Sequence, residues 1–284
     1  MYAPDYDALD DALPDRVQPG GEPEVVGMHE LGDRFLAVSE AMPRVGRQGV
    51  FGFVYGELTH LLGDVMDGKP EVAHLPRIEN PDVLIRQANY FAQEWFNPSH
   101  DLVAWGKAWQ AGDMEKARSI AWGSDQLWRR SFDEPAVQLA SPPIQLIAGG
   151  LTNHIVKDLP PSLIKSGVTE SYMRPGGDYD NVSQHISFVS RRLATEMMSG
   201  NRAVLRTGAL SVARAVAVMR GMAKHTYDEL RGADDQESYD EIVRRSTRSA
   251  IRMNSFTLNK GEPVVKLFGR MALIGAEPKP APRG

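Results

Sequence analysis

The sequence contains no cysteine, and this absence removes several kinds of chemistry at once. Disulfide bonds, thiolate nucleophiles, iron–sulfur clusters and cysteine-ligated zinc all require that residue. A chain without cysteine fits a reducing compartment, so we expect a cytoplasmic protein. The acidic start, MYAPDYDALDDALPD, lacks the positively charged segment and the apolar segment of a secretory signal, and export by that route is not expected.

Long uncharged hydrophobic runs are also missing. The most apolar long segment, 203–223, carries Arg206, Arg214 and Arg220, and an arginine costs about 3 kcal/mol at the centre of a bilayer. We therefore expect no membrane insertion. Basic residues are not in excess, because the formal net charge is −5. Since binding to nucleic-acid phosphates depends on accumulated Lys and Arg contacts, we expect no nucleic-acid partner.

Common cofactor and nucleophile motifs are absent as well. The chain has no GxGxxG, GxxxxGK(S/T) or GxSxG sequence, so neither a nucleotide or flavin cofactor nor a nucleophile elbow is expected. Glu57 and His60 have the spacing that helical di-metal proteins use in duplicate. A helical wheel places both of them away from the apolar face of their segment, which argues against a ferritin-like site.

The chain does have the apolar pattern of helices. Apolar residues recur every three or four positions, whereas period-two alternation is hard to find. We predict an all-α protein with a single domain over 28–273, a bundle of about ten helices around a central apolar helix at 202–231. A flexible acidic N-terminal arm (1–27) and a flexible C-terminal tail (274–284) are expected to flank it. The predicted helices are 28–42, 48–66, 81–97, 99–111, 113–132, 142–158, 179–199, 202–231, 236–256 and 262–273.

Two polar residues in an apolar stretch, GGLTNHIVKDLPP at 149–161, indicate a site. His154 and Asp158 lie four positions apart on the same stripe as Ile147 and Leu151, so both are predicted to face the core. Pro160 predicts that the helix ends at Asp158. A carboxylate in a last turn opposes the helix dipole, so a positive partner is expected: a metal ion, an arginine, or His154 in its charged form.

Three other residues are candidates for the same interior. Asp178 and His185 lie at the margin of the apolar stripe of 179–199, and with His154 and Asp158 they could hold one divalent metal ion. Asp178 is equally explained as an N-cap, and His185 as a buried structural histidine. Arg214 lies in the most apolar helix and needs a carboxylate, so it is predicted to pair with Asp158 or Asp178 or to bind an anionic substrate group.

The central motif resembles a bacterial helical family catalogued as domain of unknown function five-nine-nine-five. LTNHIVKDLP matches the H-I-x-x-D-L pattern of that family through His154 and Asp158. Weaker similarities follow in the same order along the chain, in VYGELT (Tyr55, Thr59), YFAQEW (Phe91, Ala92, Trp95), WRRSFD (Trp128, Phe132), DYDNV (Asp178, Val182) and ARAVAV (Arg214). The resemblance implies a helical fold and selects these positions, but the family name carries no activity.

All five tryptophans fall between Trp95 and Trp128, and core packing explains such large side chains well. The alternative is that they form the wall of an apolar substrate pocket. With the positions that the resemblance selects, we expect Tyr55, Thr59, Trp95 and Trp128 to contact a substrate.

Two classes of function follow from these residues. The first is a cytoplasmic enzyme that acts on a largely apolar small molecule through His154, Asp158 and Arg214, as a hydrolase, cyclase or isomerase, for example in biosynthesis. A divalent metal ion could take part. The second is a non-catalytic helical binding or scaffold protein in which the polar cluster is structural. The sequence does not define an oligomeric state.

Overall fold

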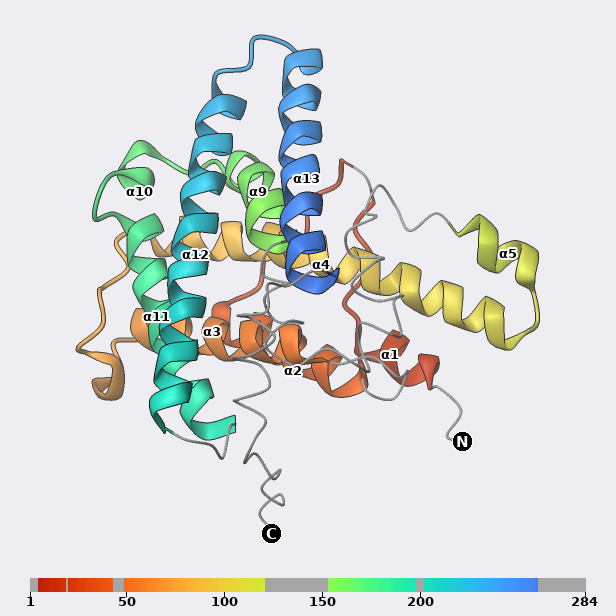
Figure 1. Cartoon of the computed structure of the whole chain (residues 1–284), viewed down its shortest axis with the longest axis horizontal. Coiled ribbons are helices and arrows are strands. Elements are labelled where there is room, and N and C mark those ends of the chain that lie inside the picture. The colour runs from red at the N-terminus through yellow and green to blue at the C-terminus, as the bar shows by residue number, and fades with distance from the viewer. Residues whose placement is uncertain (1–4, 19, 43–48, 121–152, 198–201, 260–284) are drawn as a thin grey trace, which may run out of the picture.

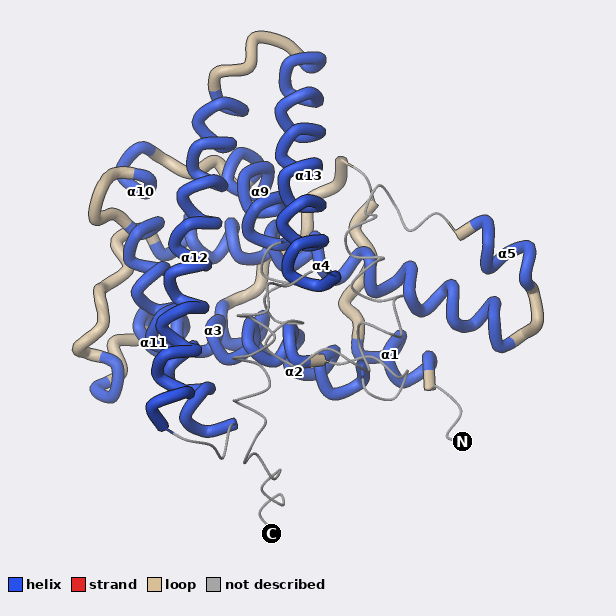
Figure 2. Tube along the Cα trace, viewed as in Figure 1, coloured by secondary structure: helices blue, strands red, loops and turns tan. Residues whose placement is uncertain are grey.

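The computed structural model describes residues 5–18, 20–42, 49–120, 153–197 and 202–259. Within these ranges the regular secondary structure is entirely helical, with ten α-helices and no strand (Figure 2). The prediction of an all-α protein with about ten helices is confirmed. In chain order the helices are α1 (Tyr6–Ala12), α2 (Met28–Ala41), α3 (Val50–Met66), η2 (Pro70–Val72), α4 (Pro81–Gln110), α5 (Met114–Ser119), η3 (Asn153–Asp158), α9 (Leu159–Lys165), α10 (Glu170–Met173), α11 (Asp178–Met197), α12 (Arg202–Arg231) and α13 (Gln236–Asn259).

Helices α2 and α3 pack unusually closely because glycine lies at their contact. A Cβ atom at Gly56 would lie 2.7 Å from the Leu36 side chain, and one at Gly52 would lie 2.5 Å from the Trp95 ring. Both distances are shorter than real Cβ contacts. Small residues one turn apart therefore let the backbone of α3 approach its neighbours, and the two helices form one side of the core.

Helix α4 is 30 residues long and runs along the length of the molecule (Figure 1). Two helices were predicted here, 81–97 and 99–111, with a break at Pro98, and this was wrong. Proline removes one backbone donor inside a helix and costs about 3 kcal/mol there. Pro98 and Ser99 are both buried, and the Ser99 hydroxyl donates to the Trp95 carbonyl at 3.0 Å. Packing on both sides of the proline keeps the helix continuous.

Described residues of the segment 1–27, which the sequence predicted as a flexible arm, lie against α4. Leu9 of α1 is completely buried. Further along, two asparagines of α4 each bond the segment's backbone through both amide groups. Asn89 pairs with Val26 (3.2 and 2.9 Å) and Asn97 pairs with Val17 (3.2 and 3.2 Å). The backbone N–H and C=O groups of Val17 and Val26 thus bond side-chain amides in place of other backbone groups. The proline-rich segment therefore satisfies these groups without forming a helix or strand there.

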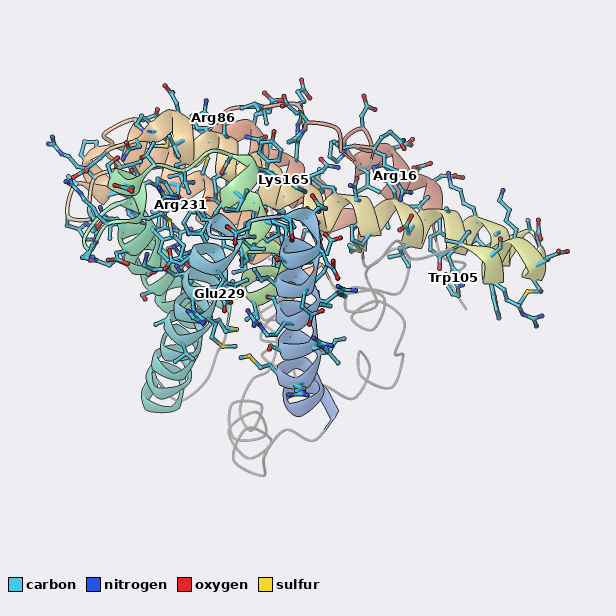
Figure 3. All side chains as sticks on the ribbon, turned by 90° about the horizontal axis from the view of Figure 1, so that it is seen from above. Arg16, Arg86, Trp105, Lys165, Glu229 and Arg231 are labelled. Carbon is cyan, nitrogen blue, oxygen red and sulfur yellow. The ribbon has the colours of Figure 1, made fainter. Side chains whose placement is uncertain are left out.

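Helices α11, α12 and α13 complete the body, and α12 and α13 stand across α4 as an antiparallel pair (Figure 1). Helix α12 has the predicted bounds, 202–231, but Val218 is 62% exposed, so it is not covered on all sides along its length. Ion pairs at the surface join neighbouring helices, and Figure 3 labels two of the basic residues, Lys165 and Arg231. Lys165 of α9 pairs with Glu94 of α4 (3.2 Å), and Arg231 of α12 pairs with Glu170 of α10 (3.1 Å).

Several predicted segments lie outside the described residues. These are the helix 262–273, the C-terminal tail 274–284, most of 113–132 and the first part of 142–158.

Candidate functional site

The site begins with an irregular helical turn. Asn153–Asp158 is a π-helical turn, and the chain runs from it directly into α9. The π-helical turn ends at Asp158, as the sequence predicted, but α9 begins at the next residue. Pro160 and Pro161 occupy the first turn of α9, where proline is well tolerated. Such π-turns are rare and are found frequently at functional sites.

The two prolines leave a carbonyl that the helix cannot satisfy. The Val156 carbonyl would accept from residue 160 in an α-helix or from residue 161 in a π-helix, and both are proline. The Ser246 hydroxyl, from α13, donates to this carbonyl at 2.7 Å, and the contact is buried. Helix α13 therefore holds the irregular turn in place.

His154 and Asp158 point into the core, as predicted. The side chains are 0% and 1% exposed, and His154 Nδ1 lies 3.1 Å from Asp158 Oδ2. The other carboxylate oxygen lies 3.1 Å from Lys157 Nζ. The positive partner that the sequence required is provided by Lys157. Asp158 also occupies the N-cap position of α9, where the helix dipole favours a carboxylate instead of opposing it.

Aromatic rings surround the imidazole. The Phe91 ring stacks on His154 with a centroid distance of 3.5 Å and an interplanar angle of 17°. Tyr55 and Phe51 meet the same imidazole edge-on, at 5.0 and 5.2 Å. Burial raises the pKa of the Tyr55 hydroxyl far above its ordinary value, and the Asp158 carboxylate raises it further. Tyr55 is therefore a neutral hydroxyl at physiological pH, next to the His–Asp pair.

Sequence reasoning missed Glu94. It lies on α4, one turn after Phe91, and its carboxyl pairs with Lys165 at 3.2 Å. Burial raises the pKa of the Glu94 carboxyl, and the Asp158 carboxylate raises it further, while Lys165 and Lys157 act in the opposite direction. The signal in the sequence was the spacing, since residues three apart share a helix face and Phe91 faces His154.

Asp178 and His185 have other partners. The Asp178 carboxylate accepts from the backbone N–H groups of Glu79 and Asn80, at 2.8 and 2.7 Å, just before α4 begins. His185 places its Nδ1 2.6 Å from the Asn181 carbonyl and its Nε2 3.0 Å from the Pro76 carbonyl. Both residues therefore anchor the segment 76–80 to α11, and Asp178 does not cap its own helix.

The predicted metal-ligand set is consequently not assembled. In the part of the chain with described side chains, no three His, Asp or Glu residues are grouped so that they could hold a metal ion. His154 and Asp158 form the pair, and Asp178 and His185 lie with the 76–80 segment.

The four predicted substrate contacts have different positions. Tyr55 contacts His154, whereas the Thr59 hydroxyl donates to the Tyr55 carbonyl at 2.7 Å. Trp95 is 2% exposed and stacks on Phe35 at 5.4 Å, so it belongs to the core. Trp128 lies outside the described residues.

The buried arginine that is seen in α12 is Arg220, while the side chain of Arg214 lies outside the described residues. Arg220 lies over the Tyr179 ring at 4.1 Å and donates to the Ser183 hydroxyl at 2.7 Å and to the Tyr179 carbonyl. A tyrosine ring and neutral oxygens thus take the place of the carboxylate that was expected for a buried arginine.

No protein-family profile, curated protein or solved structure matches the chain. Among the helices of the described residues, none is long and apolar enough to cross a membrane.

Proposed function

We propose that the protein is a cytoplasmic enzyme acting on a largely apolar small molecule, with His154 as its general acid and base. The observation that carries this proposal is the buried His154–Asp158 pair, enclosed by the aromatic rings of Phe91, Tyr55 and Phe51. Its motif is also the part of the sequence that resembles the helical family of unknown function, whose membership we likewise propose.

The proposed chemistry is proton transfer. Asp158 accepts from Nδ1 of His154 and so positions the ring, which leaves Nε2 as the atom that would exchange a proton with a substrate. The neutral Tyr55 hydroxyl would donate a hydrogen bond to a developing negative charge. Arg214 would bind an anionic substrate group. These roles suit a hydrolase, a cyclase or an isomerase, and we propose no metal-dependent step.

A second candidate function is favoured by the complete burial of the pair. A substrate reaches a 0% exposed imidazole only if the surrounding chain moves. In the second candidate the protein is a non-catalytic binding or scaffold protein, and His154, which contacts Tyr55 of α3 and Phe91 of α4, fixes the packing of η3 against these helices.

Substitution of His154 by Gln separates the two candidates. Purified wild type and His154→Gln would be incubated with fractionated small-molecule extracts, and time-dependent changes would be followed by mass spectrometry. His225→Gln is the matched control because its side chain is 77% exposed. If the protein is an enzyme, we expect wild type and the control to convert a compound that His154→Gln does not convert. The circular dichroism spectrum of His154→Gln should then equal that of wild type.

Two results would decide against catalysis. A conversion that His154→Gln carries out as fast as wild type would remove His154 from the mechanism. A large loss of stability in His154→Gln, with no conversion by any of the three proteins, would support the structural role.

A further inference from the structure

A second histidine pair lies outside the proposed active site, on the face where α2 meets α3. His29 of α2 and His60 of α3 face each other, with 3.3 Å between their Nδ1 atoms. Their side chains are 40% and 28% exposed, so ions in solution can reach them. Each ring has a carboxylate at its other nitrogen. Asp67 lies 2.9 Å from Nε2 of His29, and Asp33 lies 3.0 Å from Nε2 of His60.

The carboxylates determine which nitrogen of each neutral ring carries the proton. A carboxylate only accepts hydrogen bonds, so Nε2 of His29 is the donor to Asp67, and a neutral imidazole has a single N–H. Asp33, 3.0 Å from Nε2 of His60, favours a proton on that nitrogen as well. Both Nδ1 atoms of His29 and His60 then present lone pairs to each other at 3.3 Å. Two facing lone pairs repel unless a positive charge lies between them. In this tautomer the arrangement suits a cation, either a shared proton or a metal ion.

The separation of the two nitrogens suits a metal ion. Two nitrogens held about 2.0–2.1 Å from a tetrahedral zinc ion are about 3.4 Å apart, close to the 3.3 Å between His29 and His60. Histidine ligands of metals almost always donate their second N–H to a carboxylate or a carbonyl. Asp67 accepts this bond from His29, and Asp33 lies 3.0 Å from Nε2 of His60. Asp64 adds negative charge 3.8 Å from His29 Nε2 and is itself paired with Lys69.

Glycine makes space for both rings. A Cβ at Gly32 of α2 would lie 2.7 Å from the His60 ring, and a Cβ at Gly63 of α3 would lie 2.8 Å from the His29 ring. Each ring thus fills the space over a glycine of the opposite helix. The histidines are consequently part of the helix contact and are not two surface side chains that meet by chance.

We propose that His29 and His60 bind one divalent late transition-metal ion, such as zinc or copper, through their Nδ1 atoms. No group of three or more ligating side chains is found among the described residues, so water completes the coordination. The ion links α2 to α3, with Asp33 and Asp67 orienting the two ligands. This site does not depend on the proposed catalytic role of His154.

The test is metal binding by the full-length protein after treatment with a chelator. Titration with zinc chloride in a calorimeter is expected to give one site per chain in wild type. His60→Gln and His29→Gln each remove one ligand, and we expect the affinity to fall at least 10-fold. Asp67→Asn keeps both ligands, and its affinity should fall about 10- to 100-fold, as for other carboxylates that orient a ligand. The control, His225→Gln, should bind as wild type does.

Copper provides a second measurement. Electron paramagnetic resonance of the Cu²⁺ protein should show coupling to two imidazole nitrogens in wild type and to one in His60→Gln. The proposal is wrong if wild type binds no zinc, in which case a shared proton explains the pair. It is equally wrong if His60→Gln binds zinc as tightly as wild type. Should His60→Gln fail to fold, Asp67→Asn and the copper spectrum of wild type still decide the question.

Discussion

At the scale of single residues, the buried carboxylate of Asp158 contacts both His154 and Lys157. Its carboxylate lies 3.1 Å from both His154 and Lys157. The sequence predicted the inward orientation of His154 and Asp158 because residues four apart share a helix face. It also predicted that Asp158 needs a positive partner. It could not identify Lys157, because adjacent residues do not face each other on a regular helix and only the three-dimensional path of the lysine side chain brings its amine back.

Replacement of Asp158 by alanine should strongly destabilise the fold. Removing one partner of a buried ion pair leaves the other charges uncompensated, which costs about 3–5 kcal/mol. Urea denaturation followed by circular dichroism would measure the loss. Asp228→Ala is the control, since Asp228 is exposed and its ion pair with Lys224 is long, at 3.7 Å. Equal losses in the two variants would show that the buried pair is not important for stability.

Glu94 should make stability depend on pH. Because burial raises the pKa of this carboxyl in the folded state, the folded protein binds its proton more tightly than the unfolded chain does. The stabilisation from this proton is present at low pH and is lost as the pH rises through the raised pKa. Glu94→Gln cannot titrate, so its stability relative to wild type should increase as the pH rises from about 4 through the raised pKa. Denaturation at a series of pH values tests this, and a constant difference would contradict it.

At the scale of elements, the irregular turn η3 shows what periodicity cannot reveal. The pattern of apolar residues located the helix, and the prolines predicted its end, but the chain continues into α9 through Pro160 and Pro161. The donor for the Val156 carbonyl comes from Ser246, 90 residues later. Such distant partners cannot be predicted from local sequence, because they depend on how α13 packs. The same applies to Pro98, where tertiary packing outweighs a local preference.

Ser246→Ala tests the contact that holds η3. The substitution leaves the Val156 carbonyl buried without its donor, at a cost of about 1–3 kcal/mol. Ser249→Ala, three residues further along α13, is the matched control, because the Ser249 hydroxyl makes an exposed bond to the Arg245 carbonyl. Thermal unfolding of both variants would compare them. If Ser246→Ala unfolds at the same temperature as Ser249→Ala, the hydroxyl does not stabilise the turn.

Two glycine substitutions should have opposite effects. A Cβ at Gly52 would lie 2.5 Å from the buried Trp95 ring, so Gly52→Ala should lower the free energy of unfolding by about 1–3 kcal/mol through overpacking. Gly221 of α12 has open space around the same position. There, alanine should stabilise the helix by up to about 1 kcal/mol. Chemical denaturation of the two variants would measure both changes in the free energy of unfolding. Destabilisation by Gly221→Ala would contradict the open space around this position.

At the scale of the whole molecule, the helical body agrees with the sequence, and the N-terminal segment makes contacts that its composition does not indicate. The bounds of α12 were predicted because uninterrupted apolar periodicity ends at glycine 232. The first 27 residues were predicted to be flexible because Pro, Gly, Asp and Glu are typical of disorder. Composition does not reveal that Leu9 is buried in the core. Nor does it reveal that Asn89 and Asn97 of α4 form hydrogen bonds with the backbone of this segment. The Arg16–Asp101 ion pair, at 2.6 Å, adds to this attachment.

Leu9 and Val25 distinguish a docked segment from a flexible one. Leu9 is 0% exposed, and Leu9→Ala should lower the free energy of unfolding by about 2–5 kcal/mol because it leaves a cavity between α1 and the body. Val25, on the same segment, is 49% exposed, and Val25→Ala should change stability by less than about 0.5 kcal/mol. Urea denaturation would measure both. In a flexible segment both substitutions would leave stability unchanged. An unchanged stability of Leu9→Ala would therefore support the flexible arm that the composition predicts.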